Sequence, residues 1–204
     1  MYTLYYSPGA CSVATHVVLS ELSQNVNIVD VNHVDDFKSI NALGQVPVLI
    51  DGEKKLAEGA AIMLYLLDKH ENILLPTTGS ARNKAIEDIM FANATMHPAY
   101  SKLFFIAQKL NDDNTKQAAL NAAADNINHL WYFVENKLVN GKFLGGNKPS
   151  TADIMLAVYA TWGKYFPVDI INGEKTTAMI DAVQAMPSFV KVIAAQQAES
   201  AKSL

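Results

Sequence analysis

Cys11 is the only cysteine in the 204-residue chain, and it lies at a predicted turn between a strand and a helix. Residues 3–6 (TLYY) favour a strand and residues 7–9 (SPG) end it. Apolar residues at helical spacing then predict a helix from about Ser12. In the first turn of that helix, outward-facing backbone N–H groups favour an anion and lower the pKa of a thiol. Cys11 is therefore either a reactive thiolate or a small buried apolar residue, as most single cysteines are.

Two further residue pairs have the chemistry of a binding site. The bond from Val46 to Pro47 can be cis at modest cost, which would turn the N–H and C=O of Val46 outward from the sheet. An extended peptide could pair with those groups, although an ordinary proline at the start of a strand explains the pair equally simply. Glu58 and Gly59 begin another predicted helix, whose amides suit a carboxylate while Glu58 suits an ammonium group. The alternative is a first-turn glutamate that complements the helix dipole.

The elements around these residues form a predicted strand–helix–strand opening followed by a hairpin. Apolar residues follow one another in residues 27–31, which is typical of a parallel strand buried on both faces. A third strand is predicted over residues 44–50, and the turn at residues 51–53 leads to a short antiparallel strand. A helix over residues 58–70 follows. Residues 74–80 are the best linker candidate.

Beyond this linker the pattern is helical throughout. One long helix contains Pro98, where we expect a kink because proline removes a hydrogen bond and clashes with the preceding turn. Ser150 and Asp153 form a predicted capping box before an almost wholly apolar helix over residues 154–159. Pro187 marks the first turn of a last helix.

Composition excludes several classes of protein. Half of the residues are hydrophobic and 18% are charged, which predicts a large core and no disorder. The net charge of −4 argues against nucleic acid as a partner, and no apolar run has the length of a membrane span. A single cysteine fits a reducing compartment, so we expect a cytoplasmic protein. No metal is predicted, because the five histidines are scattered without ligand spacing, and no phosphate-binding glycine motif is present.

The order of these motifs resembles the cytosolic glutathione transferase family, in particular its bacterial beta class. The resemblance rests on residues 6–12 (YSPGACS), 41–47 (NALGQVP) and 58–66 (EGAAIMLYL), and it covers essentially the whole chain. It implies an α/β thioredoxin-like domain over residues 1–77 that binds glutathione. It also implies an all-α domain over residues 78–204 with a pocket for a hydrophobic electrophile, and a homodimer.

The resemblance also implies roles for the glutathione-binding residues. In this family the residue before a cis-proline pairs with the cysteinyl unit of glutathione, which assigns that role to Val46 beside Pro47. Glu58 and Gly59 would hold the γ-glutamyl end, with Gly59 standing where many relatives have serine. Cys11 would hydrogen-bond the glutathione sulfur or exchange with it as a mixed disulfide.

Other candidates depend on the resemblance more heavily. Tyr6 and Ser12 would be supporting residues, through packing or helix capping. His33 is the nearest basic residue to the position where relatives often have a lysine for the glycine carboxylate. His97 aligns with a histidine near the thiol, but proline follows it where relatives usually have lysine. Trp162 either lines the electrophile pocket or belongs to a helical core.

Three functions follow from these observations. The first is conjugation of reduced glutathione, as co-substrate, to electrophilic small molecules, as in detoxification, with possible disulfide exchange through Cys11. The second is glutathione-dependent reduction of disulfides or peroxides, by a monothiol route because no second cysteine is present. The third is a non-catalytic binding protein of the same fold.

Overall fold

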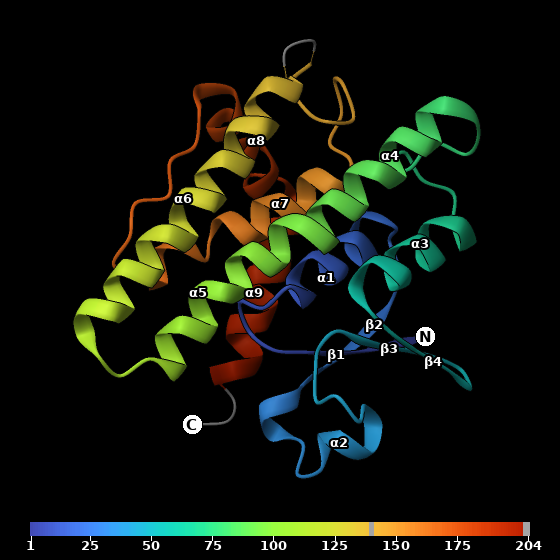
Figure 1. Ribbon diagram of the computed structural model, residues 1–204. Helices are drawn as coiled ribbons and strands as arrows, with labels where there is room; N and C mark the ends of the chain where they lie inside the picture. Colours follow the sequence, from blue (N-terminus) through green and yellow to red (C-terminus); the bar gives the residue numbers. More distant parts are fainter. Residues whose placement is uncertain (139–140, 202–204) are drawn as a thin grey trace. The chain divides into compact units, whose positions relative to one another are not determined.

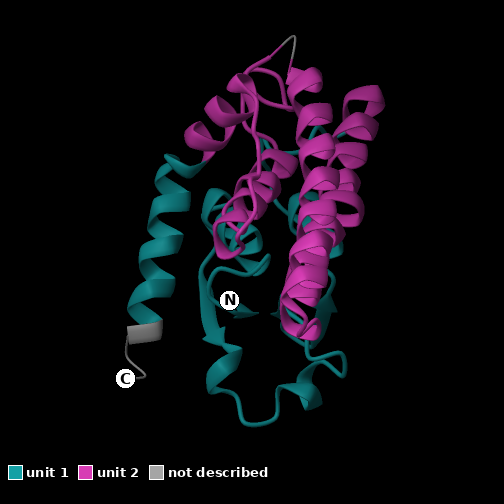
Figure 2. Cartoon of the chain, turned by 60° about the vertical axis from the view of Figure 1, so that its left-hand side comes forward, with its two compact units in different colours: residues 1–77, 184–204 teal, residues 78–183 magenta. Residues whose placement is uncertain are grey.

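A computed structural model describes residues 1–138 and 141–201, and these residues form two compact units. Unit 1 comprises residues 1–77 together with residues 184–204, and unit 2 comprises residues 78–183 (Figure 2). The first is a mixed α/β unit and the second is helical, which confirms the predicted fold class.

Within its described residues, unit 1 contains a four-stranded mixed sheet in the order β2-β1-β3-β4 (Figure 1). The strands are β1 (Tyr2–Tyr6), β2 (Val26–Asp30), β3 (Val48–Asp51) and β4 (Lys54–Ala57). β1 pairs in parallel with β2, whereas β3 runs antiparallel to both β1 and β4. Gly52 forms the predicted β3–β4 turn with φ of +59°, a conformation that favours glycine. The predicted opening and the hairpin are therefore confirmed.

Helices cover the two faces of the sheet unequally. α1 (Ser12–Glu21) and α3 (Gly59–Lys69) pack on one face, and α2 (Phe37–Ile40) lies on the other (Figure 1). Along β1 the side chains alternate between fully buried and half-buried, as the two-residue period of a strand requires. The ring of Tyr5 faces α2, with its centroid 5.8 Å from that of Phe37.

The prediction that the second strand is buried on both faces is wrong. β2 is an edge strand, and of its five residues only Asp30 is buried. The run of apolar residues in β2 has the same pattern as a central strand, so strand order had to come from the tertiary structure.

The last helix, α9 (Pro187–Ala201), belongs to unit 1 and packs against α1. The expected boundary after residue 77 coincides with the division between the units, but residues 184–201, which we expected in the second domain, group with the first. Helical periodicity shows that a segment has an apolar face, but it does not show which of the two units that face packs against. Residues 202–204 of the expected domain lie outside the described residues.

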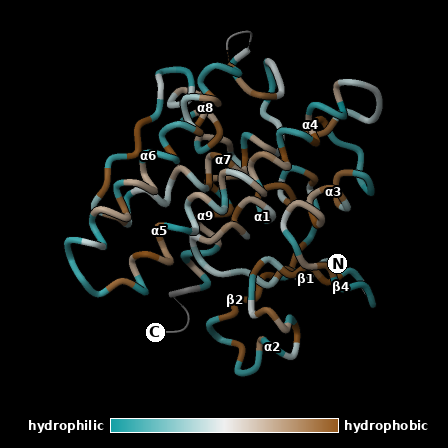
Figure 3. The backbone as a smooth tube through the Cα atoms, viewed as in Figure 1, coloured by the Kyte–Doolittle hydropathy of each residue, from teal (hydrophilic) through white to brown (hydrophobic). Residues whose placement is uncertain are grey.

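Unit 2 is built from helices around a core that includes Trp131, whose indole N–H donates to the Tyr100 hydroxyl at 2.9 Å. The α-helices are α4 (Gly79–Phe91), α5 (His97–Lys109), α6 (Asp113–Lys137), α7 (Thr151–Ala160) and α8 (Glu174–Gln184). The apolar residues along α7 are visible in Figure 3, and Thr151 to Tyr159 are all buried. α7 is thus the central helix that its sequence predicts.

Pro98 is accommodated by a change of helix type. A π-helical turn, Ala92–Met96, separates α4 from α5, and within it the His97 N–H donates to the carbonyl of Ala92. Pro98 then occupies the first turn of α5, where a missing N–H costs least. α4 and α5 follow each other along one helical course (Figure 1). In place of the kink expected at Pro98, the structure has a π-helical turn just before the proline.

Ser150 and Asp153 form the predicted capping box at the start of α7. The Asp153 carboxylate accepts hydrogen bonds from the Ser150 N–H at 2.8 Å and the Ser150 hydroxyl at 2.6 Å. It also accepts from the Leu144 N–H at 2.9 Å. Burial raises the pKa of Asp153 above its ordinary value, although these hydrogen bonds act in the opposite direction.

α8 begins on a carboxylate supplied by another helix. Glu135 of α6 accepts from the N–H of Lys175 at 3.1 Å, and from the N–H and hydroxyl of Thr176 at 2.8 and 2.7 Å. A Cβ at Gly173 would lie 2.3 Å from Cδ of Glu135, so only glycine permits this approach.

Among the described residues, no single helix combines the length and the apolar character needed to cross a membrane; α8 and α9 do so only when they are counted together across a bend.

Candidate functional site

The turn that carries Cys11 is held by its own backbone and by Ser12. The Ala10 N–H donates to the Ser7 carbonyl at 3.1 Å. The buried Ser12 hydroxyl accepts from the Ser7 N–H at 3.2 Å and donates to the Ser7 carbonyl at 3.3 Å. Ser12 therefore ties the turn together from within, in keeping with a supporting role, and its hydroxyl is not presented at the surface.

The Cys11 thiol is half-buried and donates a hydrogen bond to the carbonyl of Val46, with Sγ 3.4 Å from the oxygen. Burial raises the pKa of this thiol to about 11. The amides of Cys11 and Ser12 lower the pKa less than burial raises it, and the Glu58 carboxylate raises it further. The amides at the helix start lower the pKa of Cys11, as predicted, but burial outweighs them, and a pKa of about 11 favours the protonated thiol over the expected thiolate at neutral pH.

Val46 and Pro47 are joined by a cis peptide bond, as the sequence suggested. Val46 is half-buried and precedes β3, so its backbone lies outside the strand pairing of the sheet. Asn41 holds the approach to this bond, because its side-chain amide donates to the carbonyl of Gln45 at 2.8 Å. Asn41 is a positioning residue that sequence reasoning missed as an individual, although it lies in one of the quoted motifs.

Glu58 has a strained backbone at the start of α3. Its φ of +68° and ψ of 112° lie in a region that residues other than glycine rarely adopt. The side chain is exposed and makes no capping hydrogen bond to the helix that begins at Gly59. Strain of this kind typically costs about 1–3 kcal/mol and gathers at functional sites. The first turn of α3 consequently presents its amides without a side-chain cap, next to an exposed carboxylate.

Tyr6 and His33 lie in very different surroundings. Tyr6, the last residue of β1, is fully buried on the same face of the sheet as Leu4, which makes it a core residue of unit 1. Alternation along the strand puts Tyr6 and Leu4 on one face, which the fold covers, so the Tyr6 hydroxyl is not available at the surface. His33 is exposed in a short 3-10 turn that follows β2.

His97 belongs to unit 2, where it lies among aromatic side chains. Its ring centroid is 5.3 Å from that of Tyr159 and 5.4 Å from that of Trp162, both in edge-on geometry. The Ser101 hydroxyl donates to the carbonyl of His97 at 3.0 Å. Trp162 is 5% exposed and contacts Tyr100 edge-on, so its ring is largely part of the helical core. Sequence reasoning missed Tyr159, which no helical spacing connects to His97.

The residues that lie together in unit 1 can make two kinds of contact with a ligand. The backbone of Val46, outside the sheet, can pair with an extended peptide, and the thiol beside it can donate a hydrogen bond to an anionic sulfur. Glu58 and the amides that follow it can hold an ammonium and a carboxylate on one amino-acid group. The structure thus brings Cys11, Val46 and Glu58 together, while His97 has its own setting in unit 2.

Comparison with known proteins gives a consistent assignment. The family model for the glutathione S-transferase N-terminal domain matches residues 1–68, and the model for the C-terminal domain matches residues 93–183. A relative from Xanthomonas campestris pv. campestris, glutathione S-transferase GST-4.5, is 32% identical over 96% of this chain and 98% of that protein.

Solved structures agree with these matches. The bacterial beta class glutathione S-transferase of Sphingomonas chungbukensis has a TM-score of 0.82 and 27% identity, over 95% of this chain and 98% of that one. A sphingomonad glutathione S-transferase complexed with glutathione has a TM-score of 0.81 and 28% identity, over 96% and 98%. The chain belongs to the glutathione S-transferase family. It is accordingly an enzyme with the fold of that family, and among its similar structures is one of the bacterial beta class.

Proposed function

We propose that this enzyme conjugates reduced glutathione to hydrophobic electrophilic small molecules. The observation that carries the proposal is the contact between the Cys11 thiol and the carbonyl of Val46, at 3.4 Å. In this contact, a thiol that can donate a hydrogen bond lies beside backbone groups that are not paired in the sheet. A tripeptide whose central residue is cysteine would place its own sulfur at that contact when its backbone pairs with Val46.

The two ends of glutathione are assigned to the neighbouring groups. Glu58 would pair with the ammonium of the γ-glutamyl unit, and the amides from Gly59 onward would bind its carboxylate. Pro47, which follows Val46, is buried. His33 remains our candidate for the glycine carboxylate, because it is an exposed basic residue that follows β2.

The raised pKa of Cys11 favours one of its two possible roles. A thiol with a pKa of about 11 is a hydrogen-bond donor at neutral pH and a poor nucleophile. We therefore assign Cys11 the role of donating its S–H to the glutathione thiolate, which becomes the attacking group. His97 and Trp162 are the proposed electrophile-side residues, since they form an aromatic group within unit 2.

Two substitutions of Cys11 test this assignment against disulfide exchange. Cys11→Ser keeps a donor at the position and Cys11→Ala removes it. With a chloronitrobenzene-type electrophile, we expect Cys11→Ser to retain turnover and Cys11→Ala to lose about tenfold in kcat/KM. Equal loss in both variants would contradict the donor role.

Glu58→Gln tests the glutathione side of the site independently of the sulfur. We expect about a tenfold rise in the KM for glutathione with little change in kcat, because a charge-assisted contact to the bound tripeptide is lost. Glu53→Gln, at an exposed position in the β3–β4 turn, is the matched control. A wild-type protein that neither turns over the electrophile nor is retained on glutathione resin would leave only the non-catalytic alternative.

The second candidate function is reduction of mixed disulfides. A Cys11 thiolate would attack the disulfide between glutathione and a small thiol, forming a Cys11–glutathione disulfide and releasing that thiol as its thiolate. A second glutathione thiolate would then release oxidised glutathione and restore Cys11. Turnover of a mixed disulfide that exceeds turnover of the electrophile, together with a glutathione adduct that intact mass measurement loses in Cys11→Ala, would favour this function.

We also propose an oligomeric state and a cellular compartment for the protein. We propose a homodimer, which light scattering during size-exclusion chromatography would test. We propose the cytoplasm as the location, because the lone cysteine suits a reducing compartment.

A further inference from the structure

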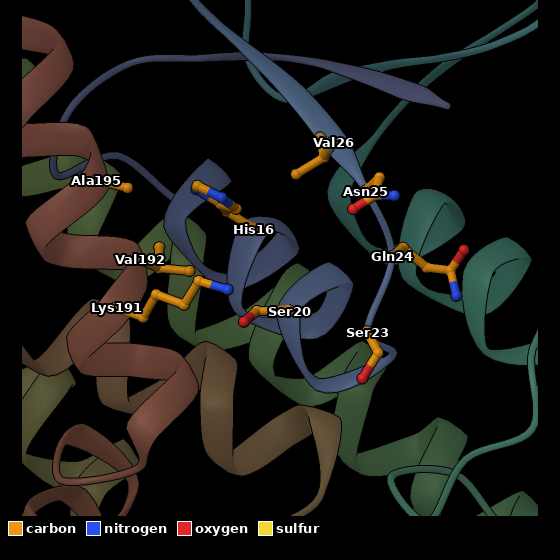
Figure 4. Close-up of a pocket in the computed structure, with 9 residues that line it drawn as sticks. All are labelled: His16, Ser20, Ser23, Gln24, Asn25, Val26, Lys191, Val192 and Ala195. Atoms are coloured by element: carbon orange, nitrogen blue, oxygen red, sulfur yellow. The ribbon is translucent and has the colours of Figure 1, made fainter.

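A cavity of about 380 Å³ opens in unit 1 between α1, α9 and the segment that leads into β2 (Figure 4). Its lining is mainly polar and includes His16, Ser20, Ser23 and Lys191. The volume lies within the range of about 300–1,000 Å³ that small-molecule sites usually have. The cavity is at the opposite end of α1 from Cys11, since nine residues of helix, or about 13 Å, separate Cys11 from Ser20.

His16 presents a hydrogen-bond donor to this cavity. The side chain is only 7% exposed, and its Nδ1 lies 3.4 Å from Nε2 of Gln196 on α9. With the amide nitrogen of Gln196 facing Nδ1, we assign Nδ1 as the acceptor and place the ring proton on Nε2. Burial, with a smaller contribution from Lys191, lowers the pKa of His16 to about 4. The ring is thus a neutral donor at physiological pH.

Lys191 is the charged residue among the remaining polar groups of the lining. Figure 4 shows the Lys191 side chain extending from α9 toward α1, where Ser20 lies. The lining residues that the structure describes include no Asp or Glu. At the end of α1, the carbonyls of Ser20 and Leu19 each accept a backbone hydrogen bond at 3.0 Å, from Ser23 and Gln24 respectively. The exposed Lys191 ammonium, the buried His16 ring and the half-buried Ser20 hydroxyl therefore line one open cavity whose described lining holds no carboxylate.

We propose that this cavity binds a small organic anion, whose carboxylate or phosphate group pairs with Lys191 and accepts hydrogen bonds from the His16 Nε2–H and the Ser20 hydroxyl. The ligand would contact α1 and α9 at once, and so would add a link between the last helix and the sheet-bearing part of unit 1. The proposal concerns neither the Cys11 turn nor the glutathione-side residues, so it stands independently of the proposed function.

The experiment is a titration of the whole protein with inorganic phosphate and, separately, with citrate, at constant ionic strength maintained with chloride. The ring signals of His16 are followed by NMR at pH 7. We expect a saturable shift with at least one of the two anions, and the anion that saturates identifies the phosphate or the carboxylate class. Lys191→Met should weaken the binding about tenfold or more, because it removes the charge-assisted contact. Lys109→Met, at an exposed position on α5, should bind as the wild type does.

A second variant separates loss of binding from loss of structure. Ser20→Leu places a larger apolar side chain at a half-buried helix position on the wall of the cavity, and it should abolish binding while circular dichroism and glutathione turnover stay as in the wild type. The proposal is overturned if neither anion gives a saturable shift of His16, or if Lys191→Met and Lys109→Met bind equally well.

Discussion

The starts of α1 and α3 in unit 1 differ from the starts of α6, α7 and α8 in unit 2. In unit 1, α1 follows Cys11 and α3 follows Glu58, and neither residue makes a side-chain hydrogen bond to the helix it precedes. In unit 2, the first N–H groups of α6, α7 and α8 are capped by side-chain oxygens of Asp112, Ser150 and Glu135. The division is not one of units throughout, because Asp36 caps α2 in unit 1 and α4 in unit 2 has no side-chain cap. A missing cap typically costs about 1 kcal/mol. The two open starts coincide with the glutathione motifs, so we interpret them as amides kept available for a ligand.

The capped start of α7 should be the most sensitive of all. Asp153→Ala leaves the buried N–H groups of Leu144 and Ser150 without their acceptor. We expect the free energy of unfolding to fall by about 3 kcal/mol, as measured by urea denaturation. Asp112→Ala removes an exposed cap from α6 and should cost about 1 kcal/mol. Equal losses of unfolding free energy in the two variants would show that burial of the capping box does not increase its contribution to stability.

Burial of Cys11 at the start of α1 should protect its thiol from alkylation. With a pKa of about 11 against an ordinary 9.0, Cys11 should react with iodoacetamide at pH 8 about a hundredfold more slowly than in the urea-unfolded chain. The alkylation rate should rise with pH because the thiolate is the nucleophile. Below the pKa of about 11, the thiolate fraction and the rate rise about tenfold per pH unit between pH 7 and 9. A rate that levels off below pH 9 would mean that the helix start does activate the thiol.

The start of α8 should show a smaller loss of stability than the start of α7. Its cap is the carboxylate of Glu135, which belongs to another helix, α6. Glu135→Gln keeps the shape and one acceptor oxygen but loses the charge that Thr176 and Lys175 N–H groups face. We expect a loss of about 1.5 kcal/mol in the free energy of unfolding. Glu174→Gln, exposed in the first turn of the same helix, is the control and should cost a few tenths of that amount. A larger loss from Glu174→Gln would contradict the assignment of the cap.

The smallest effect is expected at the strained start of α3. Glu58→Gly relieves a positive φ of 68° and should raise the free energy of unfolding by about 1 kcal/mol while it weakens glutathione binding. Ser23→Gly is the matched control, because Ser23 has φ of 55° at the other end of α1 and no assigned part in glutathione binding. Stability should rise in both variants, and the KM for glutathione only in the first. If Glu58→Gly bound glutathione as the wild type does, the strained residue would have no ligand role.

Local chemistry explains what could be predicted. The turn at Cys11, the hairpin at Gly52 and the box of Ser150 with Asp153 depend on residues close in the chain, and each is present in the structure. Expectation and structure differ where segments far apart in sequence meet: burial raises the pKa of Cys11, and two elements are placed differently. β2 lies at the edge of the sheet, and α9 packs against α1 across more than a hundred and sixty intervening residues.

The sequence by itself determined the family, the order of the elements and the two motifs that flank the proposed sulfur site, because turns, caps and periodicity act over a few residues. Only the tertiary structure decided the protonation of Cys11, the burial of Tyr6 and the cavity at His16. Those three properties depend on which groups distant segments of the chain shield from water. Such shielding sets the pKa of a thiol and decides whether a hydroxyl can reach a ligand. It cannot be read from the type of a single residue.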